Sequence, residues 1–218
     1  MSVKLDLVRL ATVFLVIVSG GFANMAFADE LYCKGEYYKG YYDDVYVKYG
    51  DVCILKGTKV EGNVHVEKGG ALITKYAKIK GDIQAYYPKF IRVMKKSYVD
   101  GNIQIEKASY PSRVTDSYVK GDIEVEYSYI RKYVEYAWNI SKNYVGGNLK
   151  FNYNKSKYGK HWIYGNKIEG NLECYDNYPK PNGGDNFVFG NAEGQCYDLA
   201  AYHYDYGDYD DYDYDYDD

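Results

Sequence analysis

The amino-acid sequence predicts an all-β protein, a single-stranded, right-handed parallel β-helix (solenoid) with rungs of about 20 residues. One short motif recurs along the chain at a nearly constant spacing, and apolar and polar residues alternate within it. Strand crossovers favour the right-handed sense. The alternative is an antiparallel sandwich of short strands, which the regular spacing disfavours. The motif centres on a glycine followed by Asn or Asp; its six glycines, 19, 20, 20, 26 and 23 residues apart, are Gly62, Gly81, Gly101, Gly121, Gly147 and Gly170.

Each copy of the motif has the period of a strand with one buried face. Around Gly62, the residues two before, two after and four after the glycine are Val60, Val64 and Val66, with polar residues between them. We expect the glycine at a corner where a Cβ is disfavoured. The Asn or Asp after it is expected to hydrogen-bond local backbone at the turn. Second strands of the rungs are predicted near Leu72 and over residues 91–93.

Residues 1–28 have the features of a secretory signal peptide. Lys4 and Arg9 give a positive start, an apolar run covers residues 10–18, and Ala26-Phe27-Ala28 fits a cleavage site. The apolar run is too short to span a bilayer comfortably, and no transmembrane segment is expected in the mature chain. We therefore expect a secreted protein, extracellular, periplasmic or at the cell surface. The β-helix domain with terminal caps should then cover residues 29–198.

The net charge is unevenly distributed along the chain. The whole sequence has a formal charge of −4, and removal of the leader, with two cations and one anion, makes it −5. Residues 199–218 hold eight Asp and no Lys or Arg, so the body carries only +3. A charge of this size does not indicate a nucleic-acid-binding surface. No nucleic-acid partner is expected.

Four cysteines in an exported chain predict two disulfides. Cys33 and Cys53 are 20 residues apart, and Cys174 and Cys196 are 22 apart, which is about one rung in each case. Residues stacked on adjacent rungs are within the Cα distance that a disulfide needs, about 4.4–6.8 Å. The predicted pairs are therefore Cys33–Cys53 and Cys174–Cys196. Metal ligation is the rival interpretation, although the sequence has no Cys-x-x-Cys and its three His are scattered.

The ends of the body and its widest part are predicted to be irregular. Residues 29–58 should form a capping rung, with strands at 45–47 and 52–55, since an uncapped end would polymerise. The inserts 127–143 and 153–164 are predicted to be loops on one side. They contain Trp138, His161 and Trp162, and we treat the two tryptophans as candidate ligand contacts that stack on sugar rings. The alternative is that these aromatic residues fill a wider hydrophobic section of the coil.

The segment 178–196 differs from the repeats because two prolines and a glycine pair interrupt their rhythm. Phe187 and Phe189 are expected to cover the open end of the core, and Cys174–Cys196 to hold that cover in place. This segment, the Gly-Asn/Asp-(Val/Ile/Leu) unit and the cysteines at each end resemble a family of exported bacterial β-helix proteins, most of them uncharacterised. The coil is also similar to that of bactofilins, which are polymer-forming cytosolic proteins. The resemblance covers residues 50–198 and implies a fold and an exported context; the leader and disulfides depart from the bactofilin pattern.

Two rows of outward-facing side chains, at fixed positions of the repeat, distinguish a catalytic from a structural role. A β-helix lyase or hydrolase needs carboxylates that converge in a cleft. Three residues after the glycines, only two separated carboxylates occur, with Lys150 between them. One residue before the glycines, the sign alternates through Glu61, Lys80, Asp100 and Lys120, which predicts ion pairs between rungs. No catalytic residues are assigned.

Tyrosine is the most unusual residue of the sequence, with 31 copies. Tyr98, Tyr118 and Tyr144 share the position three before the glycine, so they should form a ladder on a parallel sheet. The ladder is a candidate contact for polysaccharide or another protein. The equally weighted alternative is that Tyr simply serves as a strand former.

The Tyr/Asp-rich tail over residues 199–218 is predicted to be disordered, because it is low in complexity and densely charged. In an extended chain, Asp211, Asp213, Asp215 and Asp217 would share one side and bind calcium weakly. The alternative is a tail that only keeps the protein soluble. No other metal or cofactor is expected.

The sequence as a whole favours an exported, non-enzymatic structural or adhesive surface protein that binds polysaccharide or a cell-surface protein through Tyr-rich faces. One alternative is a carbohydrate-processing enzyme, a lyase or hydrolase. Another is a cation-binding envelope protein that acts through the tail.

Overall fold

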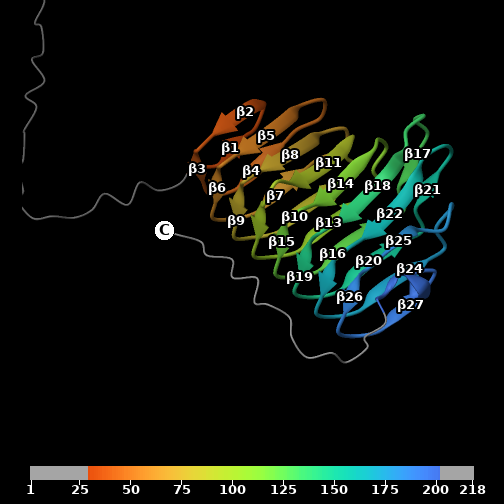
Figure 1. Cartoon of the computed structure of the whole chain (residues 1–218). Coiled ribbons are helices and arrows are strands. Elements are labelled where there is room, and N and C mark those ends of the chain that lie inside the picture. Colours follow the sequence, from red (N-terminus) through yellow and green to blue (C-terminus); the bar gives the residue numbers. More distant parts are fainter. Residues whose placement is uncertain (1–28, 202–218) are drawn as a thin grey trace, which may run out of the picture.

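A computed structural model of the chain describes residues 29–201 and shows an all-β parallel β-solenoid of about eight turns (Figure 1). Successive turns, here called rungs, are about 20 residues apart, as the spacing predicted. Each rung places one strand in each of three sheets, A, B and C, and strands of neighbouring rungs pair in parallel. The predicted fold class is confirmed, and the right-handed sense of the coil stays a prediction.

The strands of each sheet follow the order of the rungs. Sheet A contains β1 (Leu31–Tyr32), β4 (Val45–Val47), β7 (Val64–Val66), β10 (Ile83–Tyr86), β13 (Ile103–Glu106), β16 (Ile123–Glu126), β20 (Leu149–Asn152), β24 (Leu172–Tyr175) and β27 (Ala192–Gly194). Sheet B contains β2 (Gly35–Tyr38), β5 (Val52–Lys56), β8 (Ala71–Lys75), β11 (Phe90–Met94), β14 (Ser112–Thr115), β18 (Tyr136–Ser141), β22 (Lys160–Tyr164) and β25 (Asn182–Gly184). Sheet C contains β3 (Tyr41–Tyr42), β6 (Lys59–Val60), β9 (Lys78–Ile79), β12 (Tyr98–Val99), β15 (Tyr118–Val119), β19 (Tyr144–Val145), β23 (Lys167–Ile168) and β26 (Phe187–Val188). A small sheet D contains β17 (Tyr129–Ile130) and β21 (Lys155–Ser156), and a short 3₁₀ helix, η1, covers Tyr197–Leu199.

The core fills the inside of the coil with the apolar positions of the repeat. Around Gly101, for example, Val99, Ile103 and Ile105 are all buried. Burying one such side chain contributes about 1.5–3 kcal/mol. The same three positions are buried in every repeat, so the core is a continuous column of mostly aliphatic residues, with Phe151 and Cys174 in the last two repeats.

Glycine is needed in the repeat because the backbones of neighbouring rungs approach closely there. A Cβ built on Gly101 would lie 2.7 Å from the carbonyl oxygen of Gly81 and would also strike the side-chain oxygen of Asp82. None of the six repeat glycines has a φ in the left-handed region. The expected steric exclusion of a Cβ is therefore present, and it comes from the close approach of the neighbouring rung.

The Asn or Asp after each glycine forms a polar ladder between rungs. The ladder begins at Asp44, which follows Asp43 in place of a glycine. Seven side-chain oxygens, those of Asp44 through Asn171, each accept a hydrogen bond of 2.6–2.9 Å from the backbone N–H of the counterpart in the next rung. The expectation of a local turn contact was wrong, because the acceptor serves the next rung instead of its own. Asp and Asn alternate over the first six positions, so carboxylates never stack directly: Asp44, Asn63, Asp82, Asn102, Asp122, Asn148, Asn171 and Asn191.

The row before the glycines forms ion pairs in the predicted alternation. Lys80 Nζ contacts Glu61, and Lys120 Nζ is 2.9 Å from Asp100. Both lysines are largely exposed, so each pair is a weak contribution to stability.

Reversing one charge of this row should lower stability slightly. We expect Lys80→Glu to reduce the melting temperature by a few degrees at most, because it adds a third carboxylate between Glu61 and Asp100. Added salt should reduce the loss. Thermal unfolding of the variant with Glu61→Lys and Asp100→Lys added should recover most of the loss; the absence of coupling would contradict the stacking of these residues.

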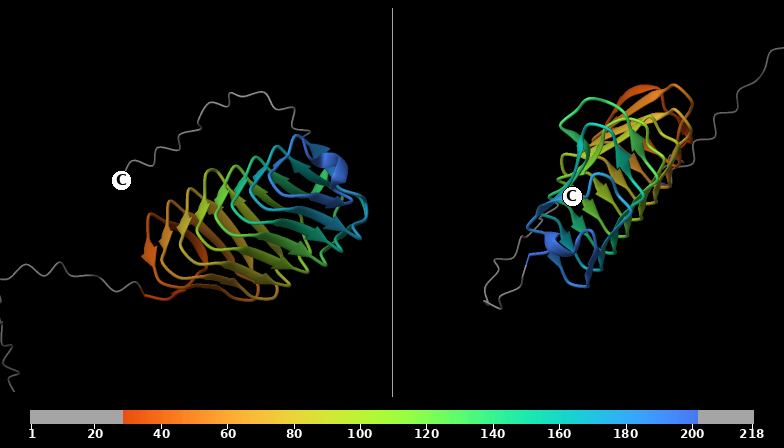
Figure 2. Two further views of the ribbon diagram at one scale, coloured as in Figure 1. Left: turned by 90° about the horizontal axis from the view of Figure 1, so that it is seen from below. Right: turned by 90° about the vertical axis from the view of Figure 1, so that its right-hand side faces the viewer.

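The inserts 127–143 and 153–164 contain strands as well as loops. They widen the coil, since β18 and β22 extend sheet B and β17 and β21 add sheet D beside it (Figure 2). The predicted loops at 127–143 and 153–164 are therefore wrong over these four strands. Parallel pairing between the two inserts stabilises the projection.

The closing segment completes another rung instead of breaking the pattern. Phe187 lies in β26, in register with Lys167, on the outer row of sheet C. Its ring meets that of Phe189 edge-on at 4.7 Å, and Phe189 is 56% exposed, so the two rings do not cover the core as predicted. Phe187, Phe189 and Gly190 instead match the outer positions and the glycine of a seventh motif copy.

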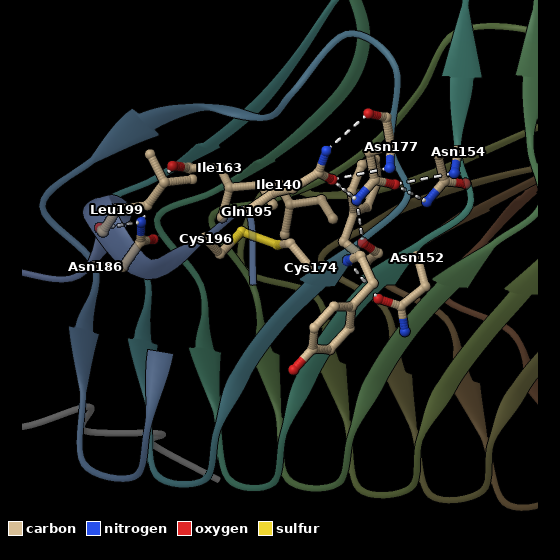
Figure 3. The surroundings of a disulfide bond; sticks show 12 residues. Ile140, Asn152, Asn154, Ile163, Cys174, Asn177, Asn186, Gln195, Cys196 and Leu199 are labelled. Atoms are coloured by element: carbon tan, nitrogen blue, oxygen red, sulfur yellow. Dashed lines mark hydrogen bonds between the residues drawn. A yellow bond between two sulfur atoms is a disulfide. The ribbon is translucent and has the colours of Figure 1, made fainter. Parts of the chain in front are cut away.

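Residues 196–201 cover the C-terminal end. Leu199 of η1 is buried, beyond the boundary predicted at residue 198. The N–H of Asn186 donates to the Leu199 carbonyl (3.2 Å), and the N–H of Ala201 donates to the Asn186 carbonyl (2.7 Å). Both predicted disulfides are confirmed: Cys33–Cys53 and Cys174–Cys196 each have a Cα–Cα distance of 5.3 Å (Figure 3 shows the second).

Two buried ladders of amide side chains line the widened part of the coil, and the sequence analysis missed both. In the first amide ladder, backbone N–H groups donate to side-chain oxygens of the next rung through Ser117, Asn143, Asn166 and Asn186. In the second amide ladder, the same pattern runs through Ser128, Asn154, Asn177 and Gln195 (Figure 3). The Asn amide nitrogens donate to main-chain carbonyls, so these buried polar groups are satisfied.

Candidate ligand-binding surfaces

The tyrosine ladder exists on sheet C, and its rings are stacked on one another. The centroids of Tyr98 and Tyr118 are 4.9 Å apart and those of Tyr118 and Tyr144 are 4.5 Å apart, with interplanar angles of 5°. Lys78 Nζ lies 5.8 Å from the Tyr98 centroid and Lys167 Nζ lies 5.5 Å from the Tyr144 centroid. Ring faces inside the ladder are therefore taken by neighbouring rings and its ends by lysines.

The stacking of the rings limits which ligands the tyrosine ladder can contact. A sugar stacks on an open aromatic face, whereas the ladder presents ring edges and hydroxyl groups. Burial, followed by the charge of Glu169, raises the pKa of Tyr144 to about 12, so its phenol stays neutral. The ladder is better suited to stabilise sheet C than to stack on sugars.

The two tryptophans occupy different environments. Trp138 is fully buried and packs edge-on against Phe151 at 6.2 Å, so it cannot contact a surface ligand; that prediction was wrong. Trp162 is half-buried on the outer face of sheet B, with its ring 5.8 Å from those of Tyr136 and Tyr164. The difference follows from strand alternation, because a bulge between Tyr136 and Trp138 turns Trp138 inward.

A groove of about 1120 Å³ lies beside sheet D, below called the aromatic groove. Tyr129 of sheet D and three tyrosines outside that sheet contribute its aromatic side chains, and three members of the second amide ladder contribute polar groups. It is lined by Tyr127, Ser128, Tyr129, Tyr153, Lys155, Ser156, Lys157, Asp176, Asn177, Tyr178 and Gln195.

The aromatic groove combines aromatic faces with hydrogen-bonding groups. Tyr127 and Tyr153 stack at 4.9 Å and 2°, which leaves each with one face away from the other. Tyr129 is 47% exposed and Tyr178 is 73% exposed. Lysine, carboxylate and amide groups surround these rings. The sequence had placed Tyr129 in a predicted binding loop, but Tyr178 came from a segment interpreted only as a cap.

The groove contains one carboxylate, Asp176. Of the other candidate carboxylates, Glu124 is paired with Lys150 at 2.9 Å on the outer face of sheet A. Glycoside hydrolysis normally requires two carboxyl groups on opposite sides of one bond. Beside its tyrosines, the groove therefore offers one carboxylate and two lysines.

His161 belongs to the core of the widened section. Its side chain is fully buried and its ring lies 5.1 Å from that of Phe151. Burial disfavours the charged imidazolium and lowers the pKa of His161 to about 4. The histidine is therefore neutral at physiological pH and does not reach the groove.

The metal predictions have two outcomes. The four cysteines are all in disulfides, so the rival interpretation of a cysteine metal site is wrong. Within residues 29–201, no three His, Cys, Asp or Glu side chains are placed to hold a metal ion together. Asp211, Asp213, Asp215 and Asp217 lie outside the described residues, and the calcium hypothesis stays a prediction.

No protein-family model, curated protein or solved structure matches this chain. The parallel β-solenoid itself is confirmed, and the resemblance to exported bacterial β-helix proteins and to bactofilins stays a prediction. Among residues 29–201, no helix has the length and apolar character needed to cross a membrane.

Proposed function

We propose that this chain is an exported structural or adhesive surface protein that binds polysaccharide in the aromatic groove. The two disulfides support an oxidising compartment outside the cytosol. The solenoid supplies a rigid support, because every rung is hydrogen-bonded to its neighbours in three sheets. The groove is the observation that carries the proposal.

The aromatic and hydrogen-bonding side chains of the groove are of the kinds that contact sugar chains. Tyrosine rings present apolar faces to C–H groups, and their hydroxyls remain available to water or ligand. Lys155 and Asp176 can exchange hydrogen bonds with sugar hydroxyls. A volume of about 1120 Å³ is at the upper end of small-molecule sites, which favours several linked units over a single small ligand.

A glycan-array screen with the secreted protein should identify the ligand, and Tyr178→Ala should test the site. We expect this variant to lose about two- to tenfold in affinity, because one aromatic contact is worth about 0.5–1.5 kcal/mol. Tyr38→Ala is the matched control, since Tyr38 is 61% exposed on the first rung of sheet B, far along the coil from the groove. Calorimetric titration should show unchanged affinity for the control.

Two results would contradict the proposal. One is an array without any bound glycan, and the other is an equal loss of affinity in both tyrosine variants. Release of new sugar chain ends during incubation would instead favour the lyase or hydrolase alternative, with Asp176 as the first residue to replace.

A further inference from the structure

The outer face of sheet B carries more positive than negative charge. Over the eight strands of this sheet, the only acidic side chain is Glu36, at the first rung, and it pairs with Lys56 at 3.9 Å. The central outward row runs in register through Ile54, Ile73, Arg92, Arg113, Asn139 and Trp162. Lysines continue the charge along the corner where sheet B leads into sheet C.

We define the cationic face as Lys75, Arg92, Lys95, Lys96, Arg113 and Lys142. None of these six takes part in an ion pair within residues 29–201, whereas nine other lysines do. The acidic neighbours at the same corner are Asp116 and Asp185. The face therefore keeps a clear positive excess.

Arg92 gives a second, independent indication that an anion is missing from this face. It stands directly beside Arg113 in the parallel register, and its guanidinium lies 4.6 Å from the Phe90 ring. Its Nε is buried and has no hydrogen-bond partner among the described residues. Burial and the charge of Arg113 both lower the pKa of Arg92, as expected for two like charges held together. A carboxylate bound at the guanidinium groups would offset the repulsion between Arg92 and Arg113.

The chain itself has an anionic segment that begins at this corner. Ala200 pairs with Asn186, which lies between β25 and β26 and hence between sheets B and C. The 17 residues after Ala201 contain eight Asp and seven Tyr and no Lys or Arg. Fully extended, 17 residues reach about 55 Å. Five rung steps separate β26 from β9, beside Lys75, which is about 24 Å.

We propose that residues 202–218 bind to the cationic face of their own solenoid. The carboxylates pair with the arginines and lysines, and the tyrosines pack on the exposed aliphatic and aromatic side chains of sheet B. The tether gives the tail an effective concentration that for short linkers reaches the millimolar range, so it outcompetes dilute external anions. The face is thereby covered, independently of whether the aromatic groove binds a glycan.

Zero-length carbodiimide coupling of carboxylates to lysines, followed by peptide mapping, tests this contact in the full chain. We expect tail carboxylates to couple within one chain to Lys75, Lys95, Lys96 or Lys142, and the yield to fall several-fold in 0.5 M NaCl. Arg92→Gln with Arg113→Gln should lower the yield several-fold. The charge-matched control is Lys80→Gln with Lys120→Gln at the corner between sheets C and A, and it should leave the yield unchanged.

A second measurement asks whether the face is covered. A form ending at Ala201 keeps every described contact, and it should bind dextran sulfate at least tenfold more tightly than the full chain. Equal binding by both forms would overturn the proposal, as would coupling spread over lysines of all faces. Coupling only between chains would assign the face to the tail of a second copy and would also overturn it.

Discussion

Replacing Asn166 with alanine should lower the free energy of unfolding by about 4 kcal/mol. Asn166 is buried in the first amide ladder, where its Oδ1 accepts from the Asn143 N–H (3.1 Å) and Nδ2 (3.0 Å). Its Nδ2 donates to the Ile140 carbonyl (3.0 Å) and to Asn186 Oδ1 (2.8 Å). The substitution leaves several buried groups without partners, and each costs about 1–3 kcal/mol.

Denaturant unfolding should be compared with that of Asn182→Ala. Asn182 is exposed on the last strand of sheet B and makes one side-chain bond, to the Lys180 carbonyl (3.2 Å). We expect this control to change stability by less than about 0.5 kcal/mol. A loss below about 1 kcal/mol for Asn166→Ala would show that water replaces the amide and that the ladder is not dry.

Acidification from pH 6.5 to pH 4 should destabilise the protein by about 3 kcal/mol through His161 alone. The pKa of this histidine is lowered from 6.5 to about 4 by burial. Between these values the unfolded chain binds a proton that the folded chain excludes, so protonation favours unfolding. Above pH 6.5 both states are neutral and the effect vanishes; below pH 4 both are protonated and the loss is complete.

His161→Phe isolates this contribution from that of the carboxylates. The phenyl ring can occupy the buried site beside Phe151 and does not titrate. Denaturant unfolding at pH 7.5, 5.5 and 4 gives the free energy of unfolding of both proteins. As the pH falls, we expect the parent protein to lose more of this free energy than the variant does. A difference in unfolding free energy that does not change with pH would mean that His161 is protonated in the folded protein as readily as in the unfolded chain.

The sequence determined the regular part of the fold and less of the candidate site. Alternation around glycines such as Gly101 fixed the buried face, and the one-rung spacing of Cys33 and Cys53 fixed their pairing. The existence of the ladder that contains Tyr98 could be predicted from the position of its residues in the repeat. The exposure of its ring faces could not, because it depends on side-chain rotamers and on the lysines in the rungs at each end. The environment of Trp138 depended on a bulge that local sequence does not mark.

The amide ladders had a signal that was overlooked. The residue four before each glycine is small or polar in every copy, and it changes from Thr58 and Ala77 to Ser97 and then to Asn143 and Asn166. In the later rungs this residue is Asn, whose amide nitrogen donates to a sheet B carbonyl of the preceding rung. The aromatic groove could not be predicted in this way, because it depends on how sheet D projects from the coil.

The positions of the two disulfides have a consequence for how the coil comes apart. A stack of rungs resembles a one-dimensional polymer in which an end unit has one neighbour and melts first. Cys33–Cys53 joins the first rung to the second, and Cys174–Cys196 joins the last turn to the one before it. The disulfides therefore restrain unfolding of the terminal rungs, where it would otherwise begin. Complete unfolding of the coil has to start between interior rungs, each of which is paired on both sides. Such a barrier slows opening of the coil and thereby slows proteolysis of the opened state.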